Sequence, residues 1–221
     1  MNLLVNAIIK FLSGLLMVGL LLFVPAGTLH YPGAWRLIAI LFIPMFIVGL
    51  IMYKKDPAFL KKRLNARESE GEQKQVIGLS LLMFIACFVL AGLDQRFGWS
   101  HFPTWLTVVS CLIFLASYGL YGEVMRENSY LSRTIEIQEG QKVISTGLYG
   151  IVRHPMYFAV VFLFYSIPLV LGCWPAFLVM LPFPLLLVKR ILNEEKVLEE
   201  GLEGYKEYEQ KVKYRLIPFV W

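Results

Sequence analysis

Residues 138–157 read QEGQKVISTGLYGIVRHPMY and separate two long apolar segments. This stretch is polar, contains a Gly-x-x-Gly step and ends in Arg-His-Pro-x-Tyr. Proline favours the first turn of a helix, where its missing N–H would be unpaired anyway, so a helix is predicted to begin at Pro155 with His154 at its cap. The free N–H groups and the dipole of that helix would face the polar loop, a setting that binds anions. Polar groups gathered where apolar helices leave a bilayer therefore indicate a ligand site.

The rest of the chain is too apolar for a soluble domain of its size. Of 221 residues, 57% are hydrophobic, and the mean hydropathy is +0.62. This composition predicts an integral membrane protein. The three cysteines and three histidines lack metal-ligand spacing, and the basic residues border apolar segments, where lipid headgroups explain them. Membrane lipids are thus expected as partners, whereas metal and nucleic acid are not.

Apolar segments of about 20 residues, the length that crosses the hydrocarbon core, define the spans. The four predicted single spans are Asn6–Ala26, Trp35–Tyr53, Val76–Asp94 and Trp105–Met125. The stretch Met156–Val188 is too long for one span and is broken by Gly172–Pro175, which predicts a helical hairpin. The predicted fold is an all-α integral membrane protein with four transmembrane helices plus this hairpin in the C-terminal half, five to six spans in total.

Lysine and arginine indicate which side of the membrane each loop occupies. Of the 21 basic residues, 18 lie in the segments 54–75 and 126–155 and in the tail from Lys189. The positive-inside rule places all three in the cytoplasm, and an even number of crossings separates them. The prediction is a multi-pass protein whose active site faces the cytoplasm.

The charged tail from Lys189 to about Lys213 is predicted to form an amphipathic helix along the cytoplasmic face. Its apolar stripe would contain Ile191, Val197, Leu198 and Leu202. Its glutamates, Glu195 among them, are assigned to the solvated side. The final residues Tyr214–Trp221 are predicted to pack back onto the membrane surface.

The charged residues near the ends of the predicted spans could have either a structural or a functional role. Arg190 and Glu194 stand four apart on one helix face and could form a weak surface ion pair. Because Arg190 ends the hairpin, its guanidinium could instead hold the carboxylate of an amphiphilic substrate bidentately. Glu123 and Glu127, at the end of the fourth span, are expected to face water or to pair with Arg126.

The loop before Pro155 either only connects two helices or folds around the flat ring of a ligand. Gly140 and Gly147 permit sharp turns in it, and Tyr149 could contact a ligand.

Together, these features resemble the integral-membrane methyltransferase superfamily, which includes isoprenylcysteine carboxyl methyltransferases and phospholipid methyltransferases. The resemblance covers the chain from about Met125 to Trp221. The matching pieces are Gln138, the segment 141–144, Gly147-x-Tyr149, Arg153-His154-Pro155-x-Tyr157, Arg190-x-x-x-Glu194-Glu195 with Leu198, Tyr205-x-x-Tyr208 and Arg215-Leu216-Ile217-Pro218.

The resemblance implies S-adenosyl-L-methionine as the cofactor. The residues that would line it are Gln138, Gln141, Lys142, Val143, Ile144, Tyr149, His154, Pro155, Met156, Tyr157 and Glu194. Arg190 would face the acceptor, and Arg190 and Glu194 are the predicted catalytic residues. Gln141 stands where the family commonly has histidine. The chain is interpreted as one membrane methyltransferase domain, 1–221, with N-terminal spans in 1–125 and the cofactor-binding and catalytic half in 126–221.

The predicted function is methyl transfer from S-adenosylmethionine to a lipophilic acceptor, most like carboxyl O-methylation of a prenylated cysteine. A phospholipid amine or a small thiol are alternative acceptors. A different chemistry is also open, because NADPH-dependent sterol reductases share the Arg-His-Pro-x-Tyr region and a similar Tyr-Arg-x-Ile-Pro ending. A third reading is a membrane scaffold without catalysis.

Overall fold

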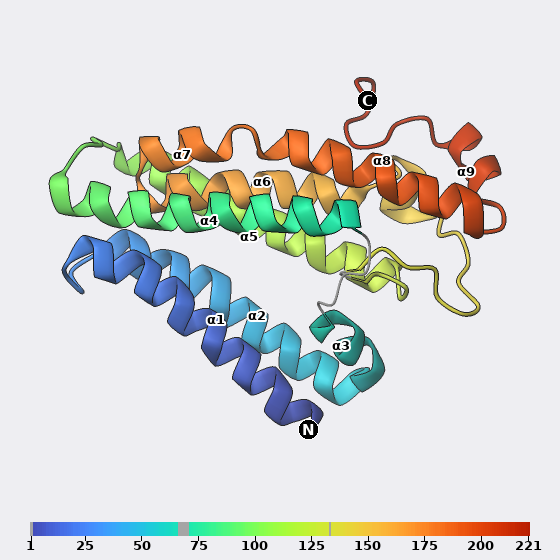
Figure 1. Cartoon of the computed structure of the whole chain (residues 1–221), viewed down its shortest axis with the longest axis horizontal. Helices are drawn as coiled ribbons and strands as arrows, with labels where there is room; N and C mark the ends of the chain where they lie inside the picture. Colours follow the sequence, from blue (N-terminus) through green and yellow to red (C-terminus); the bar gives the residue numbers. More distant parts are fainter. Residues whose placement is uncertain (1, 66–70, 133) are drawn as a thin grey trace.

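The computed structural model describes residues 2–65, 71–132 and 134–221. Within these ranges the regular elements are all helical, so the predicted all-α class is confirmed (Figure 1). The elements are α1 (Leu3–Ala26), α2 (Pro32–Lys55), α3 (Pro57–Leu64), α4 (Gly71–Phe97), α5 (Thr104–Glu127), the 3₁₀ turn η1 (Gly147–Gly150), α6 (Pro155–Leu171), α7 (Trp174–Met180), α8 (Phe183–Gly201) and α9 (Tyr205–Lys211).

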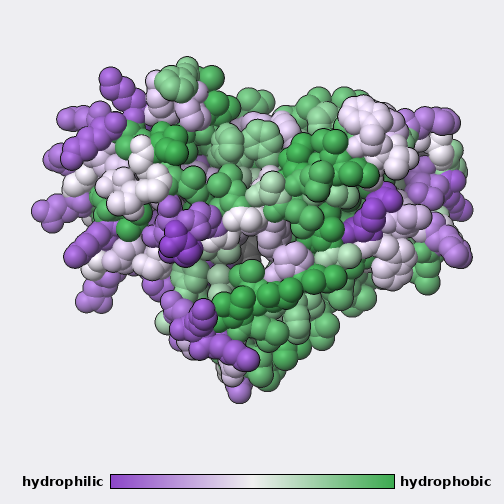
Figure 2. Space-filling view, turned by 180° about the vertical axis from the view of Figure 1, so that it is seen from behind, coloured by the Kyte–Doolittle hydropathy of each residue, from purple (hydrophilic) through white to green (hydrophobic). Residues whose placement is uncertain are grey.

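Five helical segments in the described ranges are long and apolar enough to cross a membrane. They are Leu3–Ala26, Pro32–Lys55, Gln73–Phe97, Thr104–Glu127 and Trp174–Gly201. The four predicted single spans each lie within one of them. The shorter apolar helix α6 and the α7–α8 segment form the predicted hairpin. Figure 2 shows apolar side chains over the middle of the molecule and polar ones at both ends of its long axis, as a membrane-spanning bundle requires.

Proline and glycine set the limits of these helices. Pro32, Pro57 and Pro155 each stand at the first turn of a helix, which confirms the predicted start of α6. Gly27 and Gly172 end α1 and α6 with φ of 66° and 77°, in the left-handed region that glycine adopts without a Cβ clash. The tight turn after Gly172 lets the chain reverse direction within the hairpin.

Helix α4 runs through the middle of the bundle, between the α1–α2 pair and the α7–α8 segment (Figure 1). A Cβ added at Gly92 of α4 would lie 2.5 Å from the Leu22 carbonyl oxygen of α1, so glycine is what allows this close approach. The buried residues of α1 all lie in its second half, and α1 diverges from α4 toward its first residue (Figure 1). The N-terminal pair is therefore fastened to the bundle at one end.

The described residues of the basic segment 54–75, which was expected to be a loop, include α3 and the start of α4. Asp56 caps α3 by accepting a hydrogen bond from the Phe59 N–H at 2.9 Å, and the Phe59 side chain is buried. Arg67 and Arg133, two of the basic residues used to orient the protein, lie outside the described residues.

Lys189, the predicted start of the charged tail, lies inside α8, which continues without a break to Gly201. Ile191 and Leu202 of the predicted apolar stripe are buried. The charged tail thus begins as a continuation of α8, the second helical segment of the hairpin, and continues into α9. Its position relative to a membrane surface stays a prediction.

Candidate active site

A pocket lies where α6 begins, next to α8, α9 and the loop after α5. Its empty space measures about 880 Å³, part of which is open solvent. Among its lining residues are ten of those predicted for the site: Gln141, Lys142, Val143, Ile144, Tyr149, His154, Met156, Tyr157, Arg190 and Glu194. Residues predicted from separate motifs therefore surround one space.

Two predicted contact residues, Gln138 and Pro155, support the pocket without lining it. Gln138 Nε2 donates to the Tyr130 carbonyl oxygen at 2.6 Å, and the Gln138 N–H donates to Gln141 Oε1 at 2.9 Å. Lys62 Nζ, from α3, donates to Gln138 Oε1 at 2.6 Å. Gln138 thus shapes the loop, while Pro155 sets the start of α6.

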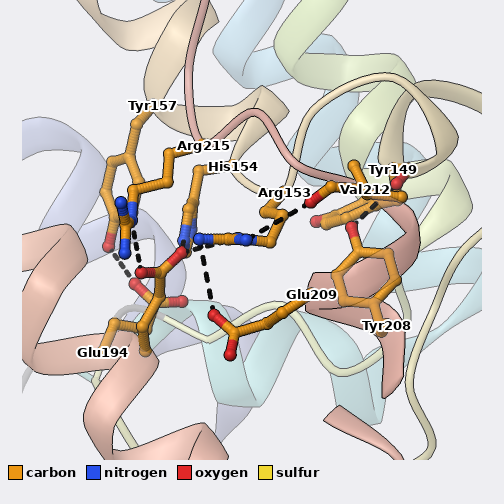
Figure 3. A network of polar contacts seen from close by, with 10 residues as sticks. Tyr149, Arg153, His154, Tyr157, Glu194, Tyr208, Glu209, Val212 and Arg215 are labelled. Atoms are coloured by element: carbon orange, nitrogen blue, oxygen red, sulfur yellow. Dashed lines mark hydrogen bonds and ion pairs between the residues drawn. The ribbon is translucent and has the colours of Figure 1, made fainter. Parts of the chain in front are cut away.

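The phenol of Tyr157 joins the two predicted catalytic residues. Its oxygen accepts a hydrogen bond from Arg190 Nε at 2.8 Å. Its O–H donates to Glu194 Oε2 at 2.5 Å (Figure 3). On its other side, Arg190 Nη1 donates to Gln73 Oε1 of α4 at 3.1 Å. The guanidinium at the pocket wall is therefore held from two directions, which fixes its orientation.

Glu195 was predicted to be solvated, and this is wrong, since it is 2% exposed. Its Oε1 lies 2.8 Å from Arg153 Nε and 3.2 Å from His154 Nε2, and its Oε2 accepts from Arg215 Nε at 2.6 Å. Figure 3 shows Arg153, His154 and Arg215 pointing toward one another. The carboxylate balances the charge of two arginines that are far apart in the sequence.

The backbone before α6 is held by the C-terminal segment. The N–H groups of Arg153 and His154 donate to the carbonyl oxygens of Tyr214 and Arg215, at 2.9 and 2.8 Å. Arg153 Nη1 also reaches the Val212 carbonyl oxygen at 3.3 Å. Arg153 and His154 therefore face the pocket while tying the end of the chain to the first turn of α6.

Tyr149 is fixed between α5 and α9. Asn128 Nδ2 donates to its phenol oxygen at 3.0 Å, and the Tyr208 O–H donates to its carbonyl oxygen at 2.7 Å. Burial raises the pKa of both phenols, so they stay protonated at neutral pH and Tyr208 remains a donor. The pocket side of η1 is thus held by two hydrogen bonds.

The predicted turn at Gly147 is confirmed, with φ of 53°. A Cβ there would overlap the carboxylate of Glu127, which instead accepts the Leu148 N–H at 3.0 Å. The expected pairing of Arg126 is found with Glu123, at 2.5 Å. Glu127 therefore caps η1, a role that the sequence pattern did not indicate.

The pocket combines both signs of charge with aromatic surface. Arg190 and Lys142 are cationic, Glu194 and Glu136 are anionic, and Tyr149 contributes an aromatic ring. The amino-terminal end of α6 adds partial positive charge. Such a lining suits a ligand that carries a carboxylate, an ammonium group and a flat ring.

Fold and site together define a multi-pass helical membrane protein with a polar pocket at one end of its bundle. Residues 108–200 match the model of the isoprenylcysteine carboxyl methyltransferase (ICMT) family. The family predicted from the motifs is thus confirmed over these residues, and the match supports a membrane methyltransferase. The matched residues include η1, α6 and the part of α8 that lines the pocket.

A second comparison finds similarity to a Delta(14)-sterol reductase of Mus musculus. The two are 27% identical over 130 residues, which are 52% of this chain and 31% of that protein. The chain thus spans less than a third of the length of this curated relative.

Proposed function

We propose that this protein is an S-adenosylmethionine-dependent membrane methyltransferase that acts on the carboxylate of a lipophilic acceptor, most like a prenylated cysteine. The observation that carries the proposal is the single pocket that unites the motif residues of the matched family region with the Arg190–Tyr157–Glu194 chain. The distribution of basic residues supports a site that faces the cytoplasm, where the water-soluble cofactor is available.

The chemistry of the pocket residues fits this cofactor. Glu194 suits the amino or ribose hydroxyl groups, and the start of α6 suits the carboxylate. Val143 and Tyr149 offer apolar and aromatic surface for the adenine. When bound, the cofactor supplies a methyl group from a sulfonium whose sulfur keeps the bonding electrons.

Arg190 would hold the acceptor carboxylate. A carboxylate is already anionic, so no general base has to remove a proton; it needs partial desolvation and alignment. Tyr157 and Gln73 fix the guanidinium at the pocket wall, which preorganises it for a bidentate contact. Positioning is then the main source of rate. A phospholipid amine or a thiol would require a proton acceptor in addition.

One observation favours a second candidate, an NADPH-dependent reductase: the partial similarity to the sterol reductase. Calorimetric titration of the detergent-purified protein with S-adenosylhomocysteine and, in parallel, NADPH separates the two. We expect micromolar binding of S-adenosylhomocysteine alone. Binding of NADPH alone would indicate a reductase. Binding of neither compound would indicate a membrane scaffold without catalysis.

The role of Arg190 is tested in the same preparation. Arg190→Ala should lower turnover with a prenylated cysteine acceptor at least a hundredfold, because a charged hydrogen-bond donor is lost, while S-adenosylhomocysteine still binds. Lys189→Ala is the matched control, since Lys189 is the adjacent cation and is exposed. Full activity of Arg190→Ala would refute the acceptor assignment.

A further inference from the structure

The end of α2 and the helix α3 gather positive charge outside the pocket. The basic residues of the stretch 54–65 are Lys54, Lys55, Lys61, Lys62 and Arg63. Asp56, the acidic residue in this stretch, caps α3. Lys54, Lys55 and Lys61 are exposed, and no described residue forms a hydrogen bond or an ion pair with their ammonium groups. Unpaired cations so near to one another in the chain repel each other, which favours the binding of an anion.

Apolar side chains next to these lysines place them at the edge of a bilayer. Helix α2 is long and apolar enough to cross a membrane, and Ile47, Leu50 and Ile51 near its end are each at least 40% exposed. Lys54 and Lys55 follow in its last turn. A cluster of basic residues directly after a membrane-spanning helix is typical of segments that bind anionic lipid headgroups.

Helix α3 is attached at the same edge of the apolar surface. Lys10 Nζ of α1 donates to the Leu64 carbonyl oxygen at the end of α3. Ile8 and Ile9, which precede Lys10, are apolar and exposed. On α3 itself the Phe59 side chain is buried, whereas the lysines are exposed. The helix therefore lies along the boundary between apolar and polar surface, where an amphipathic helix meets lipid headgroups.

Two contacts connect α3 to the pocket end of the bundle. Arg63 donates to the Tyr121 hydroxyl of α5, and its guanidinium carbon lies 5.5 Å from the centre of that ring (Figure 1 shows α3 below α5). Lys62 Nζ donates to Gln138 Oε1 at 2.6 Å, and the Gln138 N–H donates to Oε1 of the pocket-lining Gln141. Both glutamines belong to residues 134–146, the pocket loop. The position of α3 is therefore coupled to this loop.

We propose that Lys54, Lys55 and Lys61 bind the phosphate headgroups of anionic membrane lipids, and that the bound lipid holds α3 against the pocket loop. Each ammonium group ends a flexible stem, so it can follow a mobile headgroup. Phosphatidylcholine has no net charge and does not relieve the repulsion among the lysines. The site lies outside residues 108–200, which match the family, and its lipid is not consumed.

The first measurement titrates the full chain, in a neutral detergent, with short-chain phosphatidylglycerol and with phosphatidylcholine of the same chain length. The wild type should bind phosphatidylglycerol more tightly, and added salt should weaken this binding. The triple variant Lys54→Gln, Lys55→Gln and Lys61→Gln should bind it at least about tenfold more weakly, because each lysine near an anionic surface contributes about fivefold.

A second triple variant is the matched control. Lys206→Gln, Lys211→Gln and Lys213→Gln remove the same charge from exposed lysines in and after α9, and this variant should bind phosphatidylglycerol like the wild type. Equal affinity in the two triple variants would overturn the site, because net charge alone would then explain the binding. Inorganic phosphate, titrated in the same way, should bind far more weakly. Equal affinity for free phosphate would overturn the lipid as the ligand.

The second measurement follows hydrogen exchange of the pocket loop in nanodiscs. The discs contain either phosphatidylcholine alone or equal parts of phosphatidylcholine and phosphatidylglycerol. In the wild type, phosphatidylglycerol should slow exchange of the loop amides, since α3 is then held against the loop. The effect should disappear in the triple variant of Lys54, Lys55 and Lys61 and in Lys62→Ala, which lacks the contact with Gln138.

Unchanged exchange in the wild type would overturn the coupling between lipid and pocket loop. A slowing that persists in Lys62→Ala would likewise show that the contact of Lys62 with Gln138 does not transmit it. Neither measurement uses a methyl donor or an acceptor. The lipid site can therefore fail while the methyltransferase proposal stands, and the reverse also holds.

Discussion

The α1–α2 pair and the pocket end of α6–α9 are stabilised by different interactions. In the most apolar windows of α1 and α2, 11% of residues are buried, and their contacts are small residues and rings such as Phe11 against Phe42. The second region instead buries an ion cluster around Glu195 and hydrogen bonds to backbone carbonyls. The first region is mostly apolar on its outside and packs by shape. The second lines the polar pocket and holds charged groups in fixed positions.

The largest expected effect comes from removing the charge at the centre of the polar region. Glu195→Gln leaves the buried Arg153 and the partly exposed Arg215 beside a neutral group. Losing one partner of a buried ion pair, as Arg153 does here, costs about 3–5 kcal/mol. Thermal unfolding in detergent should show a large fall in midpoint. Glu199→Gln, one turn further on and exposed, should change little. Equal midpoints for the two variants would show that the cluster does not stabilise this region.

A methyl group at the α1–α4 contact tests the apolar region. Gly92→Ala brings a Cβ within 2.5 Å of the Leu22 carbonyl oxygen and should destabilise by about 1–3 kcal/mol through overpacking. Gly78→Ala on the same helix has no atom within 4 Å and is the control. The unfolding midpoint should fall for Gly92→Ala alone. A normal midpoint would mean that α1 can shift along α4 without cost.

Within α6–α9, one hydrogen bond can be removed beside the pocket and another away from it. Tyr208→Phe deletes the donor to the Tyr149 carbonyl oxygen and should cost about 0.5–1.5 kcal/mol, with weaker binding of S-adenosylhomocysteine. Tyr165→Phe deletes a donor to the Leu181 carbonyl oxygen on an exposed face of α6. Calorimetry should detect a change in affinity for the first variant only. If both variants bind S-adenosylhomocysteine with the same affinity, Tyr149 does not contribute to the cofactor site.

The smallest effect is expected where the N-terminal region touches the loop of the pocket. Lys62→Ala removes the exposed contact of Lys62 Nζ with Gln138 Oε1, worth about 1 kcal/mol or less. Affinity for S-adenosylhomocysteine should fall less than tenfold. Lys61→Ala, equally exposed, provides the reference. A loss above tenfold for Lys62→Ala would show that α3 controls the loop more strongly than its one contact suggests.

Local sequence patterns were sufficient to predict where the helices of the bundle begin and end. Pro155 and the Gly172–Pro175 break could be interpreted from residues adjacent to them, because proline and glycine act on their own backbone. Ten of the predicted site residues also line one pocket, since the loop and α8 each carry a motif.

Glu195 and Gln73 could not be predicted in this way. Each lies in a run of polar residues that indicates a solvated helix face, and helical spacing describes only neighbours on the same helix. Their partners, Arg153, Arg215 and Arg190, come from other segments. Only the tertiary arrangement reveals that these two side chains are buried.

The docking of Tyr214 and Arg215 onto the start of α6 bears on how the protein is made. A ribosome delivers α1 to α8 before Arg215, so the helices can enter the membrane while the Glu195 carboxylate still lacks one of its arginines. The pocket is then completed by residues that are translated after α8, Tyr214 and Arg215 among them. A nascent chain stalled before Arg215 would be inserted but without a finished binding site, which places the onset of ligand binding after Arg215 has been translated.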